Sequence, residues 1–229
     1  MHDPAPSTHQ AADRRPIASR QTRSAQRVAD WLIAHEVAPN AISLASIAFA
    51  ALGLLCLLGT APVGGWLARV LFLITALAAQ ARLLANLFDG MVAVGSGQAS
   101  PLGEIYNDVP DRVADVLLLV GAGFGLGGSP LLGCSAALLA LFVAYLRVLG
   151  NSLGVRDLFI GPMAKPQRMA TLTAACAYLA LAPAAWPFAL AAEGFGALSL
   201  ALALILVGSI VTSVRRLQRI AADLRTRRR

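Results

Sequence analysis

The chain has 229 residues, of which 57% are hydrophobic and 14% are charged, and its mean hydropathy is +0.67. This composition excludes an ordinary soluble domain and indicates an integral membrane protein. The formal net charge is +7, but the basic residues lie at the ends of apolar runs and no aromatic residues alternate with them. We therefore expect membrane lipids with anionic headgroups as their partners, and no nucleic acid.

The amino-terminal region lacks an apolar run near its start, so it is not a cleavable secretory signal. Residues 1–22 are expected to form a disordered basic tail. Residues 24–36 predict a short amphipathic juxtamembrane helix, because Val28, Trp31 and Leu32 recur at helical spacing while charged residues face elsewhere. A disordered arm over the same residues is the alternative.

Six apolar runs follow, each close to the ~20 residues that a helix needs to cross a bilayer. They cover residues 42–60, 66–88, 110–127, 130–150, 169–187 and 196–214. The sequence thus predicts an all-α membrane protein, with one six-helix domain at 23–216 and a basic cytoplasmic tail at 217–229. The third run carries Asp111, Arg112 and Asp115 at its start, and we expect that end to open into a watery cavity.

Basic residues are distributed very unevenly between the two sides of these runs. Eighteen of the 19 lysines and arginines fall on the side of both termini, and only Arg69 lies towards the other side. The loops of that other side, near 61–65, 128–129 and 188–195, contain neither residue. Because cytoplasmic loops are rich in lysine and arginine, we expect both termini to be cytoplasmic.

Polar residues concentrate between Asn86 and Asp115, where five of the twelve carboxylates occur. At the end of the second run, Arg82, Asn86 and Asp89 follow i, i+4, i+7 and lie on one face of a helix. Placing an ionisable side chain near the hydrocarbon of a membrane costs roughly 2.5–3.5 kcal/mol of insertion free energy, so the cluster indicates a site that binds cations.

Gly90 and Ala93 leave a surface without long side chains beside this cluster, where a diphosphate could approach the backbone. The alternative is that these small residues serve helix packing.

The third run opens with a second polar face, Asn107, Asp111 and Asp115 at i, i+4, i+8, with Asp108 beside it. Oxygen ligands suit hard divalent cations such as Mg²⁺ or Mn²⁺, and the three histidines all lie far upstream. The candidate metal ligands are Asn86, Asp89, Asn107, Asp108, Asp111 and Asp115.

These residues resemble the signature of the CDP-alcohol phosphotransferases, D-x-x-D-G-x-x-A-R, eight residues, then G-x-x-x-D-x-x-x-D. The chain offers Asn86-Leu-Phe-Asp89-Gly90-Met-Val-Ala93-Val94, then eight residues, then Gly103, Asn107 and Asp111. The spacing matches throughout, whereas Asn86 and Asn107 replace aspartates and Val94 replaces arginine. The resemblance covers most of the chain. The chain is similar in particular to a variant branch of this family, found in the bacterial inner membrane, whose members carry asparagine at the same two positions.

The resemblance implies a homodimeric, metal-dependent enzyme of phospholipid biosynthesis. Such an enzyme moves a phosphatidyl or similar group from a CDP-linked donor, expected here to be CDP-diacylglycerol, to an alcohol acceptor and releases CMP. It further implies that Asp111 deprotonates the acceptor and that Mg²⁺ or Mn²⁺ is held at the signature positions. The residues that would accommodate the CDP are Gly90, Ala93 and Gly103.

The two asparagines remove two of the four negative charges of the signature, and we expect Asp108 and Asp115 to restore them. A site with one cation or with none is the alternative. Arg147, Lys165 and Arg168 are candidates for binding a phosphate on the acceptor or an anionic lipid; simple anchoring at the membrane surface remains open for them.

Three other hypotheses compete. Residues 107–115 are also similar to the N-D-x-x-D-x-x-x-D motif of UbiA-like prenyltransferases, but the carboxyl half lacks the second acidic motif of that family. A transporter is disfavoured because the polar residues concentrate in one half of the chain. A catalytically silent membrane scaffold of the phosphotransferase fold is the more serious alternative, since Val94 and the two asparagines favour it.

Overall fold

The computed structural model describes residues 22–97, 101–155, 158–183 and 195–227. These residues form seven helices and no strand. The helices are α1 (Arg23–Ala34), α2 (Pro39–Val63), α3 (Gly65–Gly95), α4 (Pro101–Phe124), α5 (Pro130–Ser152), α6 (Lys165–Leu181) and α7 (Ala197–Arg227). The predicted tail at 1–22 lies almost entirely outside the described residues, as does the end of the predicted fifth run.

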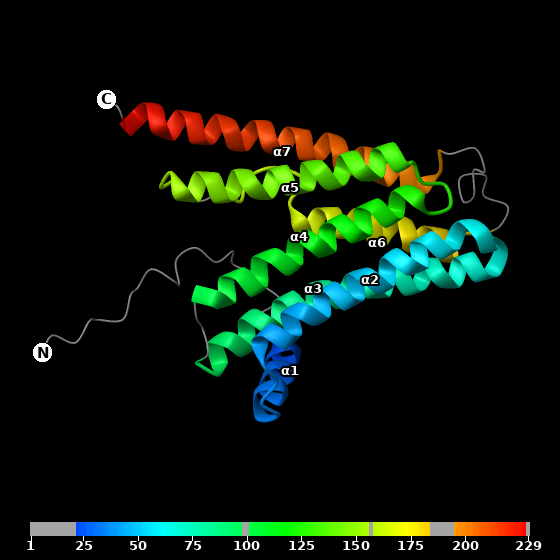
Figure 1. Cartoon of the computed structure of the whole chain (residues 1–229), viewed down its shortest axis with the longest axis horizontal. Helices are drawn as coiled ribbons and strands as arrows, with labels where there is room; N and C mark the ends of the chain where they lie inside the picture. The colour runs from blue at the N-terminus through cyan, green and yellow to red at the C-terminus, as the bar shows by residue number, and fades with distance from the viewer. Residues whose placement is uncertain (1–21, 98–100, 156–157, 184–194, 228–229) are drawn as a thin grey trace, which may run out of the picture.

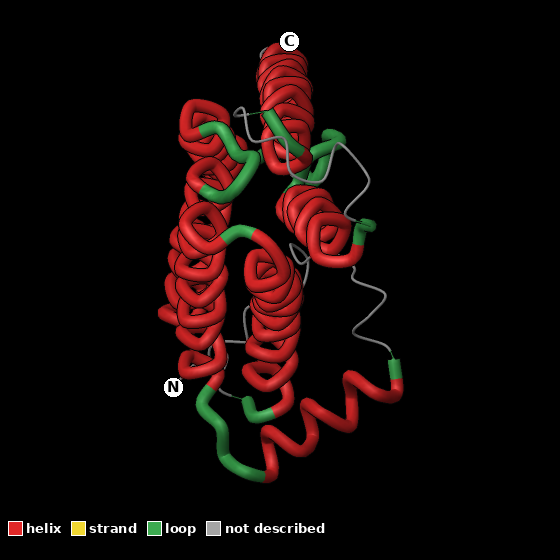
Figure 2. The backbone as a smooth tube through the Cα atoms, turned by 90° about the vertical axis from the view of Figure 1, so that its right-hand side faces the viewer, coloured by secondary structure: helices red, strands yellow, loops and turns green. Residues whose placement is uncertain are grey.

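Helices α2 to α7 run up and down in one bundle, and α1 lies across its axis (Figures 1 and 2). The turns from α2 to α3 and from α4 to α5 lie at one end of the bundle. The end of α3, the start of α4 and the carboxyl end of α7 lie at the other end (Figure 1). This arrangement agrees with the alternation of sides inferred from the apolar runs.

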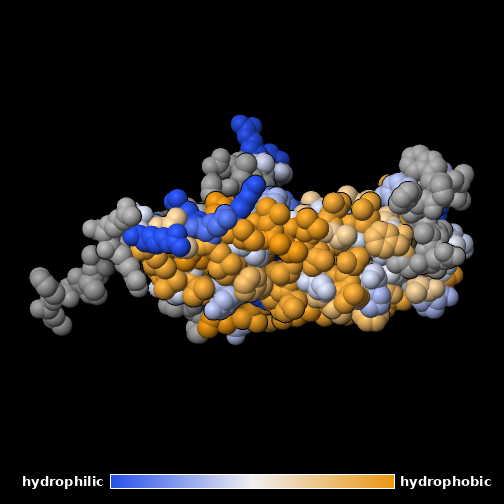
Figure 3. All heavy atoms as spheres, turned by 90° about the horizontal axis from the view of Figure 1, so that it is seen from above, coloured by the Kyte–Doolittle hydropathy of each residue, from blue (hydrophilic) through white to orange (hydrophobic). Residues whose placement is uncertain are grey.

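Within the described residues, four helices are long and apolar enough to cross a membrane, namely α2, α3, α5 and α7. Helix α4 does not qualify because it carries four charged residues near its middle, Asp108, Asp111, Arg112 and Asp115, and α6 is only 17 residues long. Six membrane crossings therefore remain a prediction. Hydrophobic residues nevertheless cover most of the face shown in Figure 3, and strongly hydrophilic ones gather in the half of the molecule where α7 ends.

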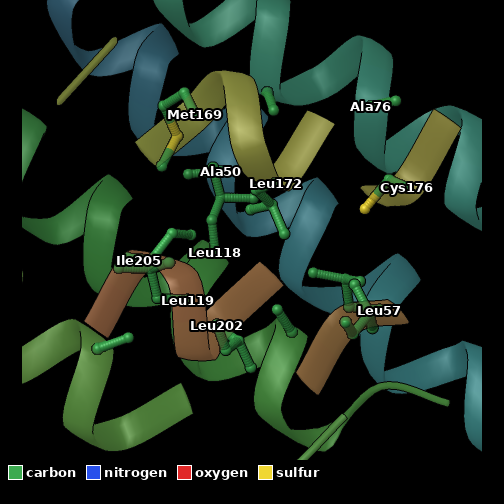
Figure 4. Packing of buried hydrophobic residues seen from close by; sticks show 14 of the residues in the cluster. Ala50, Leu57, Ala76, Leu118, Leu119, Met169, Leu172, Cys176, Leu202 and Ile205 are labelled. Atoms are coloured by element: carbon green, nitrogen blue, oxygen red, sulfur yellow. The ribbon is translucent and has the colours of Figure 1, made fainter. Parts of the chain in front are cut away.

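Helix α4 is the central helix, since it contacts α2, α3, α5 and α7. Its Leu118 and Leu119 are fully buried in a core shared with α2, α6 and α7 (Figure 4). Small residues let the helices approach closely: a Cβ on Gly133 of α5 would lie 2.7 Å from the Cα of Gly123 in α4. Asp111 and Asp115 of α4 are thereby buried inside the bundle, whereas residues 105–107 at its start are exposed.

The segment expected to lie beside the membrane is helical over Arg23–Ala34. Thr22 caps the start of α1, and Ala25 and Ala29 are buried, on a helix that contacts α3. Val28 and Trp31 are exposed on α1. An apolar face of this kind suits a membrane surface, which stays a prediction for this helix.

At the carboxyl end, α7 continues as a helix to Arg227 through most of the predicted tail. Three contacts of Arg227 stabilise this extension. Arg227 forms an i, i+4 ion pair with Asp223, and it donates hydrogen bonds to the carbonyl oxygens of Leu153 and Gly154 after α5.

Candidate functional site

A pocket of about 470 Å³ opens between α3, α4, α5, the start of α6 and α7. A volume of this size falls in the range of small-molecule sites. Helix α3 contributes Leu83, Leu84 and Leu87 to the lining, and the other elements contribute the basic side chains together with apolar ones such as Val143 and Phe159. The sequence-predicted residues that line the pocket are Asn86, Gly90, Asn107, Asp108, Asp111, Arg147, Lys165 and Arg168.

The two polar faces predicted on α3 and α4 meet directly. The side-chain amide of Asn86 donates a hydrogen bond to Oδ1 of Asp111. Asp89 lies one turn further along α3 and is buried, and its Oδ2 accepts a hydrogen bond of 2.7 Å from the hydroxyl of Ser43 in α2. Two of the four signature residues, Asn86 and Asp111, are therefore hydrogen-bonded to each other across α3 and α4. A third, Asp89, is held by a hydrogen bond from α2.

Lys165, the first residue of α6, reaches the same carboxylate. Its Nζ lies 2.6 Å from Oδ1 and 2.5 Å from Oδ2 of Asp111. The segment before α6 is fixed against α7, because the backbone N–H of Met163 donates to the hydroxyl of Thr212 over 3.0 Å. Gly161 makes this approach feasible: its φ is +109°, and a Cβ there would clash with the Thr212 side chain. The packing of this segment against α7 thus fixes the backbone position from which the Lys165 side chain reaches Asp111.

Beneath the pocket lies a buried ion cluster of Arg82, Asp115 and Arg168. Oδ1 of Asp115 lies 2.7 Å from Nη2 of Arg82, and Oδ2 lies 2.5 Å from Nη2 of Arg168. All three residues are at most 3% exposed. Arg82 also donates a hydrogen bond of 2.9 Å to the backbone carbonyl of Asp111. The cluster joins α3, α4 and α6 and orients the backbone that carries Asp111.

Asp108 lies at the mouth of the pocket and is held by two arginines. Its Oδ1 is 2.9 Å from Nη2 of Arg147 in α5 and 3.2 Å from Nη2 of Arg112, one turn along α4. Asp108 and Asp115 were expected to supply extra negative charge to a cation, but both carboxylates are engaged by arginines. We therefore leave both out of the metal site proposed below.

The lining of the pocket is electropositive. Among the described residues it contains five basic side chains, Arg112, Arg147, Lys165, Arg168 and Arg216, but only two carboxylates, Asp108 and Asp111. The amino-terminal end of α6 adds to this field, because Ala164 at its N-cap provides no side-chain hydrogen bond and the first turn faces the pocket. The site is suited to an anionic ligand such as a phosphate.

Two residues of the site were not anticipated from the sequence. Arg216 is buried on α7, where its Nη1 donates to the carbonyl of Val143 over 2.6 Å, and it lines the pocket. Ser43 bonds to Asp89. A signal for Arg216 did exist: Ser209, Thr212 and Arg216 follow helical spacing in an otherwise apolar helix and form a polar face.

Four predicted residues lie outside the pocket lining. Asp89 and Asp115 are buried behind it, while Ala93 and Gly103 are half-buried on α3 and α4. Asp115 is left out of the metal site for the reason given above, while the roles of Asp89 in binding metal and of Ala93 and Gly103 in binding CDP remain predictions.

The residues present fit one divalent cation better than several. No group of three or more histidine, cysteine, aspartate or glutamate side chains is placed to hold a metal in the described part of the chain. However, Oδ1 of Asn86 and Oδ1 of Asp89 are buried without a hydrogen-bond partner in the structure. Buried oxygens in this state are costly unless an ion or another donor satisfies them. Asn86 and Asp89 are therefore the residues that could hold a cation.

Comparison with curated proteins finds two informative relatives. The chain is 33% identical over 144 residues to the inner membrane protein YnbA of Escherichia coli, and this match covers 60% of the chain and 66% of that protein. It is 32% identical over 154 residues to the archaetidylinositol phosphate synthase of Aeropyrum pernix, covering 67% of the chain and 74% of that protein. No protein-family model matches the chain.

Solved structures show the same fold. The phosphatidylinositol phosphate synthase of Mycobacterium tuberculosis with CDP-DAG bound matches with a TM-score of 0.70 at 18% identity, covering 87% of this chain and 94% of that one. The complex of that enzyme with manganese and citrate matches with a TM-score of 0.69 at 17% identity, covering 86% of this chain and 88% of that one.

Proposed function

The chain belongs to the CDP-alcohol phosphotransferase family, and we propose that it transfers a phosphatidyl or similar phospho-alcohol group from a CDP-linked donor to a hydroxyl acceptor, releasing CMP. One observation carries the proposal: signature residues Asn86, Gly90 and Asp111 line the same pocket as the basic side chains. The reaction would contribute to phospholipid biosynthesis.

We place the donor along α3. Gly90 presents backbone without a side chain next to the signature oxygens, which lets a diphosphate approach closely. The neighbouring apolar wall of Leu83, Leu84 and Leu87 suits the acyl chains of CDP-diacylglycerol, the donor we favour. A relative of known structure binds CDP-DAG, which supports this choice. Ala93 and Gly103 are proposed to complete the CDP site, as the signature implies.

We place the acceptor at the basic wall and propose that it is an alcohol bearing a phosphate. Arg147, Lys165, Arg168 and Arg216 surround that side, and charge-assisted hydrogen bonds from arginine and lysine suit a phosphate group. Two of the proteins named above, those of Aeropyrum pernix and Mycobacterium tuberculosis, are synthases of inositol phosphate lipids, whose names place a phosphate on the product alcohol.

The geometry supports Asp111 as the general base. Its carboxylate lines the pocket, and the ammonium of Lys165 and the amide of Asn86 contact and orient it. As the acceptor hydroxyl passes its proton to Asp111, its oxygen forms a bond to the phosphorus of the phospho-alcohol group. The bond from that phosphorus to the CMP oxygen breaks, and CMP leaves with the electron pair. Mg²⁺ or Mn²⁺, when bound at Asn86 and Asp89, would neutralise charge on the diphosphate.

The proposal is tested by incubating the purified protein in lipid nanodiscs with CDP-diacylglycerol, Mn²⁺ and pools of polar alcohols. We expect chromatography to detect CMP with phosphorylated alcohols and much less with their unphosphorylated counterparts. No CMP from any pool would contradict the enzyme proposal and favour a silent scaffold. CMP from unphosphorylated alcohols alone would contradict the proposed acceptor class.

Replacing Arg147 by glutamine is expected to weaken acceptor binding. Arg147 lines the basic wall, and a hydrogen bond between charged groups contributes about 1.5–3 kcal/mol. We expect the KM for the phosphorylated acceptor to rise roughly tenfold or more, with a smaller change in kcat. Arg219→Gln, an exposed position on α7 outside the lining, is the matched control. Equal KM values for the two variants would remove Arg147 from the acceptor site.

We also propose that the protein is a multi-pass protein of the bacterial inner membrane, with both termini cytoplasmic, and that it forms a homodimer. The apolar surface of the bundle, the basic end and the relative named as an inner membrane protein support the location. The homodimer rests on the family resemblance.

A further inference from the structure

Asp111 is a signature residue expected to bind metal, but positively charged side chains already contact its carboxylate. The ammonium of Lys165 contacts both oxygens of Asp111, at 2.6 and 2.5 Å. Nη2 of Arg82 lies 3.5 Å from Oδ1 of the same group. Asp111 is thus neutralised by the protein itself.

Asn86 reduces the need for a cation beside Asp111. Its amide N–H donates directly to Oδ1 of Asp111. An aspartate at position 86 would instead bring two carboxylates together, and like charges at such a distance require a cation between them or a shared proton. The asparagine therefore replaces a metal-bridged contact by a hydrogen bond.

Two buried oxygens at the signature positions remain without a hydrogen-bond partner. Oδ1 of Asn86 and Oδ1 of Asp89 have no hydrogen-bond partner in the structure, and Asp89 is only 3% exposed. Together they offer one negative charge. Mg²⁺ and Mn²⁺ sites built on one or two carboxylates are completed by substrate phosphates and water, so these oxygens suit one ion beside a bound donor.

We propose that the ammonium of Lys165 takes the place of one divalent cation, and that the site binds a single divalent ion through Asn86 and Asp89 when the donor diphosphate is present. The charge balance supports this. Four aspartates at the signature positions would be neutralised by two divalent ions, and two asparagines remove the charge that one of those ions would balance. The inference rests on the proposed function for the identity of the diphosphate ligand.

The test is the number of Mn²⁺ ions bound per chain, measured with the purified full-length protein at saturating CDP by electron paramagnetic resonance of the free ion. We expect one Mn²⁺ for the wild type. A variant that combines Asn86→Asp, Asn107→Asp and Lys165→Met is expected to bind two. As a control, Asn40→Asp, at an exposed position of α2, should still bind one.

Two ions, or none, on the wild-type protein would overturn the inference, as would a folded triple variant that gains no ion. Should the triple variant fail to elute as a folded protein, the wild-type count alone decides. Because the measurement does not depend on turnover, its failure is distinguishable from a failure of the CMP-release experiment: one ion without CMP release would keep the metal inference and refute the proposed reaction.

Discussion

Replacing Asp115 by asparagine is expected to cost about 3–5 kcal/mol of stability, because two buried guanidinium groups would lose the carboxylate between them. Arg82 and Arg168 approach Asp115 at 2.7 and 2.5 Å, and all three residues are shielded from solvent. The loss should appear as a fall of roughly 10 °C or more in the unfolding temperature of the detergent-solubilised protein, followed by circular dichroism.

Asp108→Asn is the matched comparison for that experiment. The Asp108 side chain is 43% exposed, and its ion pairs with Arg112 and Arg147 lie at the pocket mouth. Exposed ion pairs contribute about 0–1 kcal/mol, so a fall of only a few degrees is expected. Similar unfolding temperatures for the two variants would show that the buried ion cluster does not hold α3, α4 and α6 together.

Replacing Asp111 by asparagine is expected to reduce CMP release by roughly 10²–10⁴-fold, the contribution of a general base. The amide keeps the shape of the side chain but cannot accept the acceptor proton. The rate should be measured with saturating donor and acceptor, so that the change reports kcat. Asp108→Asn retains Asp111 and should keep most of the activity. An Asp111→Asn protein that is folded and releases CMP at the wild-type rate would exclude Asp111 as the base.

Helical spacing was sufficient to predict which residues of each helix share a face. Asn86 on α3 and Asp111 on α4 were placed on two polar faces near a short connection, and their side chains do meet. Apolar runs of adequate length likewise predicted the helices, and the amphipathic pattern predicted α1. These features are local: they follow from the side-chain period and from segment length.

Contacts between distant segments could not be derived in the same way. The period of α4 places Asp115 on the polar face but does not reveal that Arg82 and Arg168 enclose it, so a free metal ligand was expected there. Arg216 follows an apolar run and was only counted among the basic residues on the side of the termini, although α7 packs so that it lines the pocket. The partner of a buried charge depends on helix packing, which a single sequence does not specify.

The most direct measurement of the central claim is the product balance of the reaction. Wild-type protein in nanodiscs would be incubated with CDP-diacylglycerol, Mn²⁺ and a phosphorylated alcohol, and both CMP and the new lipid would be quantified by mass spectrometry. We predict equal molar amounts of CMP and of a lipid whose mass equals the acceptor joined to a phosphatidyl group, both lost together in Asp111→Asn. CMP without a matching lipid, or neither product, would contradict phosphotransfer in this pocket.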